Sequence, residues 1–456
     1  LSVGEGLGQG DLTVSNGGQV SLDGPRTSLT VSQAKAGNGG SRDTMDTSQV
    51  EVSTLTIESG GQVNVNAETT ADIFLARGES SAAEVTVSGQ GSLLSATASS
   101  NGVGRMDIGQ AGNATLTIND GGRVSTLYAG AGGDFVPEGD SYGNFKTGGT
   151  GTIAVDGVGS ELELEGISNY GYGGFLTIGR TGTGSLDVTN GGTVSISSQQ
   201  GTFPGLEVGD SSIADGTTTI SGQGSSISIS GEQGSVGDGG YAGYIAVGTN
   251  NGTGSMTVEN GASVTNDESG TTFVGNDGAN SDGTLTITGS GTSFDAGARL
   301  VIGGTFDFNA GQLDLSADGT GSVTVEDGAT LTAGQDGGDD DIFVGNNGSL
   351  QVANGASLTG DVQTDNGGVF AMGSSPGLAI VQGDFDAGGE TVFELDGTAD
   401  GAFDRIDVAG DATLGGDVTF DVGGGFTPEA GDAFTIVEAD GAVALAGDLD
   451  VGVEGL

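Results

Sequence analysis

The sequence predicts an all-β protein whose fold is a right-handed parallel β-helix, or β-solenoid, that ends in a strand-rich C-terminal cap. A short unit of β-branched strand, glycine turn and second apolar strand recurs, and its turn glycines Gly121, Gly191 and Gly261 are evenly spaced. Glycine supplies 96 of the 456 residues and proline only 5, without a collagen triplet. No useful length of the chain has the apolar spacing of a helix. A fixed period of this kind indicates a repeat architecture.

Two kinds of turn alternate along the repeat. One is a Gly-Gly turn, as at Gly121-Gly122 and Gly191-Gly192, and the other is a Gly-x-Gly-Ser turn, as at Gly157-Val158-Gly159-Ser160 and Gly222-Gln223-Gly224-Ser225. The two series recur with nearly the same spacing. One structural period therefore holds two related units, and the glycines supply the positive φ and the small volume that stacked corners need.

Each unit reads as strand, glycine-rich turn, strand, tight turn, strand. Apolar and polar residues alternate within the strands, as in Ser185-Leu186-Asp187-Val188-Thr189, so one face points inward and the other to solvent. Such a unit cannot bury its apolar face alone, and stacking places equivalent strands ~4.8 Å apart in parallel sheets. We expect about 20 to 25 residues per coil, a typical size for a solenoid repeat.

The sequence pattern of the repeat changes near Gly373, which predicts two regions. Residues 1–372 are expected to form the repetitive solenoid, and residues 373–456, with longer strands such as Val392-Phe393-Glu394-Leu395, a β cap or assembly segment. A cap protects the open sheet edge of a solenoid. At the other end, Leu1-Ser2-Val3-Gly4 already reads as the opening strand of a unit, and because the chain begins with neither an initiator Met nor an apolar signal segment, we expect a processed product or a fragment.

These units resemble the repeat of type V secretion (autotransporter) passengers and PEP-CTERM-associated exported proteins over roughly residues 1 to 360. The last segment is similar to the end of an autotransporter passenger, through Ser375-Pro376-Gly377, the strand from Asp404 to Gly410, Leu414-Gly415-Gly416 and the strand from Phe434 to Val437. The resemblance implies a β-solenoid that is secreted or displayed at the cell surface of a Gram-negative bacterium. Members of the family are often adhesive or structural.

The net charge of the chain limits the classes of molecule that it can bind. The chain has 61 acidic and 10 basic residues, a net charge of −51, so it repels phosphate backbones and anionic lipid, and we expect no nucleic-acid partner. No run of 18 apolar residues is present, and no membrane span is expected.

An enzyme is not expected. Parallel β-helices also carry polysaccharide-active enzymes, and among 61 acids some carboxylate pairs arise by chance. However, the ten basic residues are scattered, and the chain lacks His and Trp, the commonest general base and the best sugar-stacking platform.

Two acidic loops are candidate Ca²⁺ sites, because oxygen ligands suit this ion. Asp339, Asp340 and Asp341 form the densest acidic turn, and Asp277 and Asp282 flank a second oxygen-rich loop. Neither loop matches an EF-hand or the nonapeptide calcium repeat Gly-Gly-x-Gly-x-Asp, and solvated turns are the alternative that the sequence favours.

Aromatic residues give a candidate contact face. Tyr172 and Phe175 are matched about one period later by Tyr241 and Tyr244, each pair in a glycine-rich insertion. These side chains would meet a glycan or another protomer if they lie on one side of the solenoid. A ladder of rings stacked in the core is the alternative, and the sequence favours it.

The sequence thus predicts an extracellular structural or adhesive solenoid. The leading hypothesis is a subunit that self-associates head to tail into a surface fibre or biofilm-matrix filament. The main alternative is a monomeric autotransporter-type adhesin passenger displayed at the cell surface, with a glycan or cell-surface ligand. A β-helix polysaccharide-active enzyme is the third class.

Overall fold

A computed structural model describes residues 1–5, 9–33, 52–99, 102–133, 148–166, 172–198, 203–231, 243–307, 312–314, 319–334, 341–353, 355–373, 376–447 and 449–455. The described residues contain β-strands and no helix, and accordingly no helix that could cross a membrane. The chain divides into two compact units, Leu1–Ser235 with Gly252–Gly254, and Val236–Asn251 with Ser255–Leu456.

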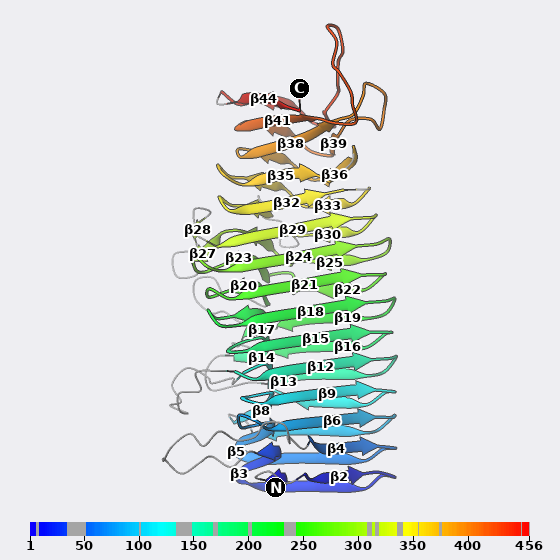
Figure 1. Cartoon of the computed structure of the whole chain (residues 1–456), viewed down its shortest axis with the longest axis vertical. Coiled ribbons are helices and arrows are strands. Elements are labelled where there is room, and N and C mark those ends of the chain that lie inside the picture. The colour runs from blue at the N-terminus through cyan, green and yellow to red at the C-terminus, as the bar shows by residue number, and fades with distance from the viewer. Residues whose placement is uncertain are drawn as a thin grey trace. The chain divides into compact units, whose positions relative to one another are not determined.

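Each complete coil of the first unit has three strands, which stack on their equivalents in the neighbouring coils (Figure 1). We call the three stacks the first, second and third ladders. The first ladder contains β2 (Asp11–Val14), β4 (Val52–Glu58), β6 (Ala82–Ser88), β9 (Asn113–Asn119), β12 (Thr150–Asp156), β15 (Thr183–Thr189) and β18 (Asp215–Ser221).

The second ladder runs through the first halves of β3 (Gln19–Gln33) and β5 (Gln62–Leu75), whose second halves belong to the third ladder. It continues through β7 (Leu93–Ala98), β10 (Arg123–Thr126), β13 (Glu161–Gly166), β16 (Thr193–Ser198) and β19 (Ser226–Gly231). The third ladder also contains β1 (Ser2–Glu5), β8 (Val103–Ile108), β11 (Tyr128–Ala131), β14 (Tyr172–Ile178) and β17 (Phe203–Asp210).

The second unit has the same three-strand plan. Its first ladder contains β21 (Thr253–Glu259), β24 (Asp282–Thr288), β29 (Thr320–Glu326), β32 (Gly348–Val352), β35 (Val369–Met372), β38 (Glu390–Leu395), β41 (Asp417–Val422) and β44 (Asp450–Glu454). Its second ladder contains β22 (Ser263–Thr265), β25 (Ser293–Asp295), β30 (Thr330–Thr332), β33 (Ser357–Thr359), β36 (Leu378–Gln382), β39 (Arg405–Val408) and β42 (Val437–Ala439).

The third ladder of the second unit contains β20 (Tyr244–Thr249), β23 (Thr271–Asn276), β26 (Arg299–Ile302), β31 (Ile342–Val344), β34 (Val362–Thr364), β37 (Phe385–Ala387), β40 (Ala412–Leu414) and β43 (Val443–Leu445). The hairpin of β27 (Thr305–Asp307) and β28 (Gln312–Asp314) is antiparallel and lies outside the ladders.

The ladders pair in parallel, which confirms the predicted parallel β-solenoid. In β15, Leu186 and Val188 are fully buried, whereas Asp187 between them is exposed, as the alternation of the sequence predicts. The core is therefore a narrow stack of Leu, Ile and Val side chains between the ladders. The predicted boundary at residue 373 stays a prediction, since parallel pairing continues from β35 to β38 and from β36 to β39 across it.

The predicted coil length is wrong for the first unit and right for part of the second, where Ser349 pairs with Val369 and Val369 pairs with Glu390. Asn113 pairs with Thr150, and Thr150 pairs with Thr183, so each of these two consecutive coils is clearly longer than the expected length of about 20 to 25 residues. Longer strands account for part of the difference, since β9 and β12 have 7 residues each, whereas β32 and β35 have 5 and 4. Two coils together make one full period, such as the step from Gly121 to Gly191.

The two turn types lie in alternate coils, and a hydrogen bond joins each Gly-Gly turn to the Gly-x-Gly-Ser turn of the next coil. Asp120 and Gly121 have positive φ angles of 52° and 83°, which fit the type I′ turn of a tight two-residue connection. In the next coil, the Ser160 hydroxyl accepts a hydrogen bond from the Gly121 N–H at 3.1 Å and donates one to the Asp156 carbonyl at 2.6 Å. The serine of each Gly-x-Gly-Ser turn thus fastens the Gly-Gly turn before it.

The same bond recurs along the chain. The acceptors are the hydroxyl groups of Ser92, Ser160, Ser225 and Thr292. They accept hydrogen bonds from the backbone N–H groups of Gly60, Gly121, Gly191 and Gly261, respectively, at 2.9 to 3.1 Å. We call this contact the Ser–Gly clasp. It explains why the two unit types alternate, because each type supplies only one partner.

A second repeated hydrogen bond joins the coils at one corner of the second unit. Asp341, Asp361, Asp384 and Asp411 each accept a hydrogen bond from the backbone N–H at the next corner, at 2.7 to 3.0 Å. The last donor of this aspartate ladder is the Ala442 N–H. Carboxylates therefore fasten consecutive coils here, as hydroxyl groups do in the Ser–Gly clasp.

The third ladder of the first unit buries side chains on both of its faces. By strand alternation Phe74 and Asp107 point away from the core, yet both are buried. Arg105 lies 3.2 Å from Asp72 and 3.6 Å from Asp107, and the guanidinium carbons of Arg77 and Arg105 lie 4.3 and 5.1 Å from the centre of the Phe74 ring. Arg105 therefore compensates the buried negative charge of Asp72 and Asp107, and its contact with the Phe74 ring adds a cation–π attraction.

Candidate functional site

One hollow of the first unit is an open polar groove on the outer side of the second ladder, with a volume of about 420 Å³. We call it the Arg123 groove. Strands β5, β7, β10 and β13 and the turns before them supply its lining, which is Gln62, Gly91, Ser92, Leu93, Ser95, Thr97, Gly121, Arg123, Ser125, Gly159, Glu161 and Glu163. The groove therefore crosses consecutive coils.

Arg123 has its place because it follows the Gly121-Gly122 turn and begins β10. Its backbone pairs with Leu93 on one side and Glu161 on the other, so the three side chains form a column across the coils. The Arg123 guanidinium forms an ion pair with Glu163, and its Nε lies 3.5 Å from a carboxylate oxygen of Glu161. The hydrogen bond with Glu163 raises the pKa of Arg123, which keeps the guanidinium charged.

The groove groups remain accessible although they are paired. The side chain of Arg123 is 46% exposed, and those of Glu161 and Glu163 are 32% and 19% exposed. Next to them, Ser95 and Ser125 form a second column with Glu163. Hydroxyl, carboxylate and guanidinium groups thus stand side by side in register, which provides hydrogen-bond donors and acceptors for a polar ligand.

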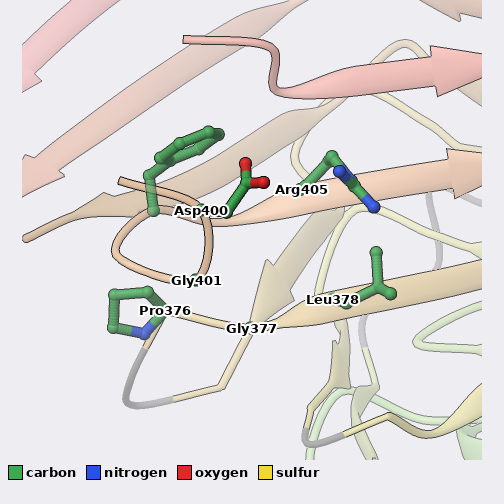
Figure 2. A pocket seen from close by; sticks show the side chains of 7 residues that line it. Pro376, Gly377, Leu378, Asp400, Gly401 and Arg405 are labelled. Carbon is green, nitrogen blue, oxygen red and sulfur yellow. The ribbon is translucent and has the colours of Figure 1, made fainter. Parts of the chain in front are cut away.

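A smaller hollow of about 360 Å³ lies in the second unit (Figure 2). Pro376, Leu378 and Phe403 supply its apolar lining, and Asp400 and Arg405 its charged groups. The Arg405 guanidinium is held by the Asp407 carboxylate, with Nε···Oδ1 and Nη2···Oδ2 distances of 2.9 and 3.2 Å, and its Nη1 lies 4.0 Å from a carboxylate oxygen of Glu438. Its cation is therefore largely satisfied within the protein.

Behind this pocket a buried carboxylate joins two of the motifs that the sequence singled out. Asp404 accepts hydrogen bonds from the backbone N–H groups of Gly377 and Glu394, both at 2.6 Å. Burial raises the pKa of Asp404 to about 7, with smaller contributions from Glu394 and Asp396, while the two hydrogen bonds oppose the shift. Asp404 thus holds the Pro376-Gly377 turn against β38, which gives both motifs a structural role.

The four predicted contact aromatics differ in their surroundings. Phe175 is buried in β14, and its ring occupies the space where a side chain at position 205 would lie, which only a glycine there permits. Tyr244 is half-buried in β20 of the second unit, with its ring centre 5.8 Å from that of Phe273. The backbone of Tyr172 pairs with Phe203, and Tyr241 lies outside the described residues. The contact face stays a prediction.

The structure describes three of the five candidate Ca²⁺ ligands. Asp339 and Asp340 lie outside the described residues, and Asp341 is buried in the aspartate ladder, where it accepts the N–H of Asp361. Asp277 and Asp282 are exposed on either side of the turn that precedes β24. Within the described ranges, no group of three or more His, Cys, Asp or Glu side chains could hold a metal ion. Calcium binding stays a prediction.

The sequence did not identify the Arg123 groove. Arg123 is distant in the chain from Glu161 and Glu163, and only the coil-to-coil register makes them neighbours. The available signal was one basic residue directly after a Gly-Gly turn and, one coil later, the glutamate-rich strand Glu161-Leu162-Glu163-Leu164-Glu165.

No family model and no curated protein matches this chain. Among solved structures, the chain is similar to the crystal structure of a TibC-catalysed, hyper-glycosylated TibA fragment. The match has 13% sequence identity and a TM-score of 0.40, and it covers 97% of this chain and 99% of that one. Similarity of this size carries no argument about function, which depends here on the residues and their geometry.

Proposed function

We propose that this chain is an extracellular adhesive β-solenoid, displayed at the surface of a Gram-negative bacterium in the manner of an autotransporter passenger. The observation that carries the proposal is the Arg123 groove, a preformed polar surface that crosses consecutive coils. Strand pairing and the Ser–Gly clasp fix the spacing of its side chains. Binding to a surface needs a fixed array of this kind, because preordered side chains lose little entropy on contact.

The chemistry of the groove favours recognition over catalysis. Both groove glutamates are ion-paired with Arg123, which suits contacts to a ligand better than proton transfer to it. The net charge of −51 favours partners that are neutral or cationic. A β-helix polysaccharide-active enzyme remains the less favoured reading.

Binding of the fluorescently labelled full chain to a panel of surfaces tests the proposal. The panel contains epithelial cells, insoluble chitin, cellulose and glass, and the control is the same chain after thermal unfolding. We expect saturable binding of the folded chain to at least one surface and loss of that binding on unfolding. Equal background binding of folded and unfolded chain to every surface would contradict the proposal.

A head-to-tail fibre, such as a biofilm-matrix filament, is the second candidate, and one observation favours it. Val443 and Leu445 on β43 and Val451 and Val453 on β44 are 51 to 68% exposed. A further coil stacked on these strands would cover them, and a second copy of this chain could supply it. Electron microscopy of the full chain tests this: regular fibres that Leu445→Asp abolishes support it, and single particles at every concentration contradict it.

A further inference from the structure

We propose that the Arg123 groove binds a neutral polysaccharide, which lies across strands β7, β10 and β13 along the stacking direction. This inference rests on the proposed adhesive function and names the ligand class for it. The groove has the size of a ligand site, and its lining comes from consecutive coils rather than from one loop.

The register of the second ladder gives the groove a regular repeat. Leu93, Arg123 and Glu161 are direct neighbours on consecutive strands, and so are Ser95, Ser125 and Glu163. Neighbouring strands lie ~4.8 Å apart, so both columns present a side chain at this interval. An extended polysaccharide has a monomer repeat close to this spacing and would meet each coil with one sugar.

The side chains supply the contacts that a sugar needs. Sugar hydroxyls can donate to the carboxylates of Glu161 and Glu163 and accept from the guanidinium of Arg123, and charge-assisted hydrogen bonds of this kind are the stronger class. The Arg123–Glu163 ion pair already orients both groups. Leu93 is half-buried beside them and offers apolar contact to the face of a sugar ring. The groove therefore combines orientation, polar contacts and one apolar patch.

Charge and polarity distinguish this ligand from other polymers. The groove contains one cation and two carboxylates within a chain of net charge −51, so an anionic polysaccharide would be repelled. Leu93 is the one large apolar side chain of its lining, whereas the centre of a protein–protein interface is usually apolar and aromatic. A neutral, hydroxyl-rich chain fits both features.

Isothermal titration of the full chain with cellohexaose and with chitohexaose tests the inference, and hexagalacturonate is the anionic comparison. We expect saturable binding of a neutral hexasaccharide and none of hexagalacturonate. Arg123→Ala should weaken the binding at least tenfold. Ser125→Tyr, which fills the groove while retaining the Arg123–Glu163 pair, should weaken it by a similar factor. The matched control is Arg26→Ala, since Arg26 is an exposed arginine of β3 outside the groove.

Several results would overturn the inference. They are absence of binding of both neutral hexasaccharides, preference for hexagalacturonate, unchanged affinity in both groove variants that melt like wild type, and burial of the groove between two copies in solution. If the full chain still binds a surface while both groove variants bind it equally well, the groove inference fails and the adhesive function stands. If the folded chain binds no surface, the proposed function itself fails.

Discussion

Removal of one hydroxyl group from the Ser–Gly clasp should loosen the coil that it fastens. Ser225 is fully buried; its hydroxyl accepts the Gly191 N–H at 3.0 Å and donates to the Ser221 carbonyl at 2.8 Å. Ser225→Ala removes both bonds and leaves a buried N–H without a partner. Loss of the bond to Ser221 costs about 1 kcal/mol and the unsatisfied Gly191 N–H costs about 1–3 kcal/mol, so the expected loss is about 2–4 kcal/mol.

Hydrogen exchange at the Gly191 amide measures this loss directly. A stacked solenoid opens locally, so the effect should be concentrated at this coil rather than spread over the chain. Since about 1.4 kcal/mol corresponds to a factor of ten, protection of the Gly191 amide should fall at least tenfold. Ser225→Thr should keep most of the protection, because Thr292 makes the same bond in the second unit, to Gly261 at 2.9 Å.

The matched control is Ser228→Ala, which removes an exposed hydroxyl from the neighbouring strand β19. It should leave protection of the Gly191 amide unchanged. The reasoning is refuted if Ser225→Ala retains wild-type protection at Gly191, or if Ser228→Ala lowers it equally.

Three further perturbations test the coil-to-coil contacts. Asp384→Ala in the aspartate ladder should expose the Asp411 amide to exchange, since the carboxylate accepts its N–H at 2.7 Å, whereas Asp384→Asn should retain most of the protection. Gly122→Ala should lower the melting temperature, because the added Cβ would overlap a backbone carbonyl of the preceding coil, whereas Gly447→Ala, where an added Cβ meets no heavy atom within 4 Å, should not; equal melting of these two variants would contradict this. The melting temperature of the wild type should fall as pH rises from about 4 to about 7. Asp404 has a pKa of about 7 in the folded chain and an ordinary value of 3.8, so over this range the folded chain holds a proton that the unfolded chain releases. Asp404→Asn keeps one of the two acceptors and should melt lower with a flatter pH dependence; an unchanged slope would refute the assignment.

The fold was largely predictable from local signals. Alternation in strands such as β15 and the positive φ of turn glycines such as Gly121 are properties of a few consecutive residues. The longer coils of the first unit were not predictable in this way, because coil length depends on which strands pair. The Ser–Gly clasp also joins different coils, so its two halves were visible as separate turn motifs and their contact was not.

The candidate site was much less accessible to sequence reasoning. Coil lengths vary, so the step from Leu93 to its partner Arg123 is shorter than the step from Arg123 to its next partner, Glu161. A constant period therefore cannot align these columns. Burial of Phe74 and Asp107 on the outer side of the third ladder was equally hidden, because strand alternation alone assigns such positions to solvent.

Retention of coated beads under flow tests the adhesive function most directly. Beads that carry the folded full chain would be compared with beads that carry the same amount of thermally unfolded chain, on a chitin or cellulose film under increasing shear. The account predicts that the folded chain holds beads on at least one film at shear that removes the control beads, and that a soluble neutral hexasaccharide releases them. Equal loss of both kinds of beads at every shear would contradict it.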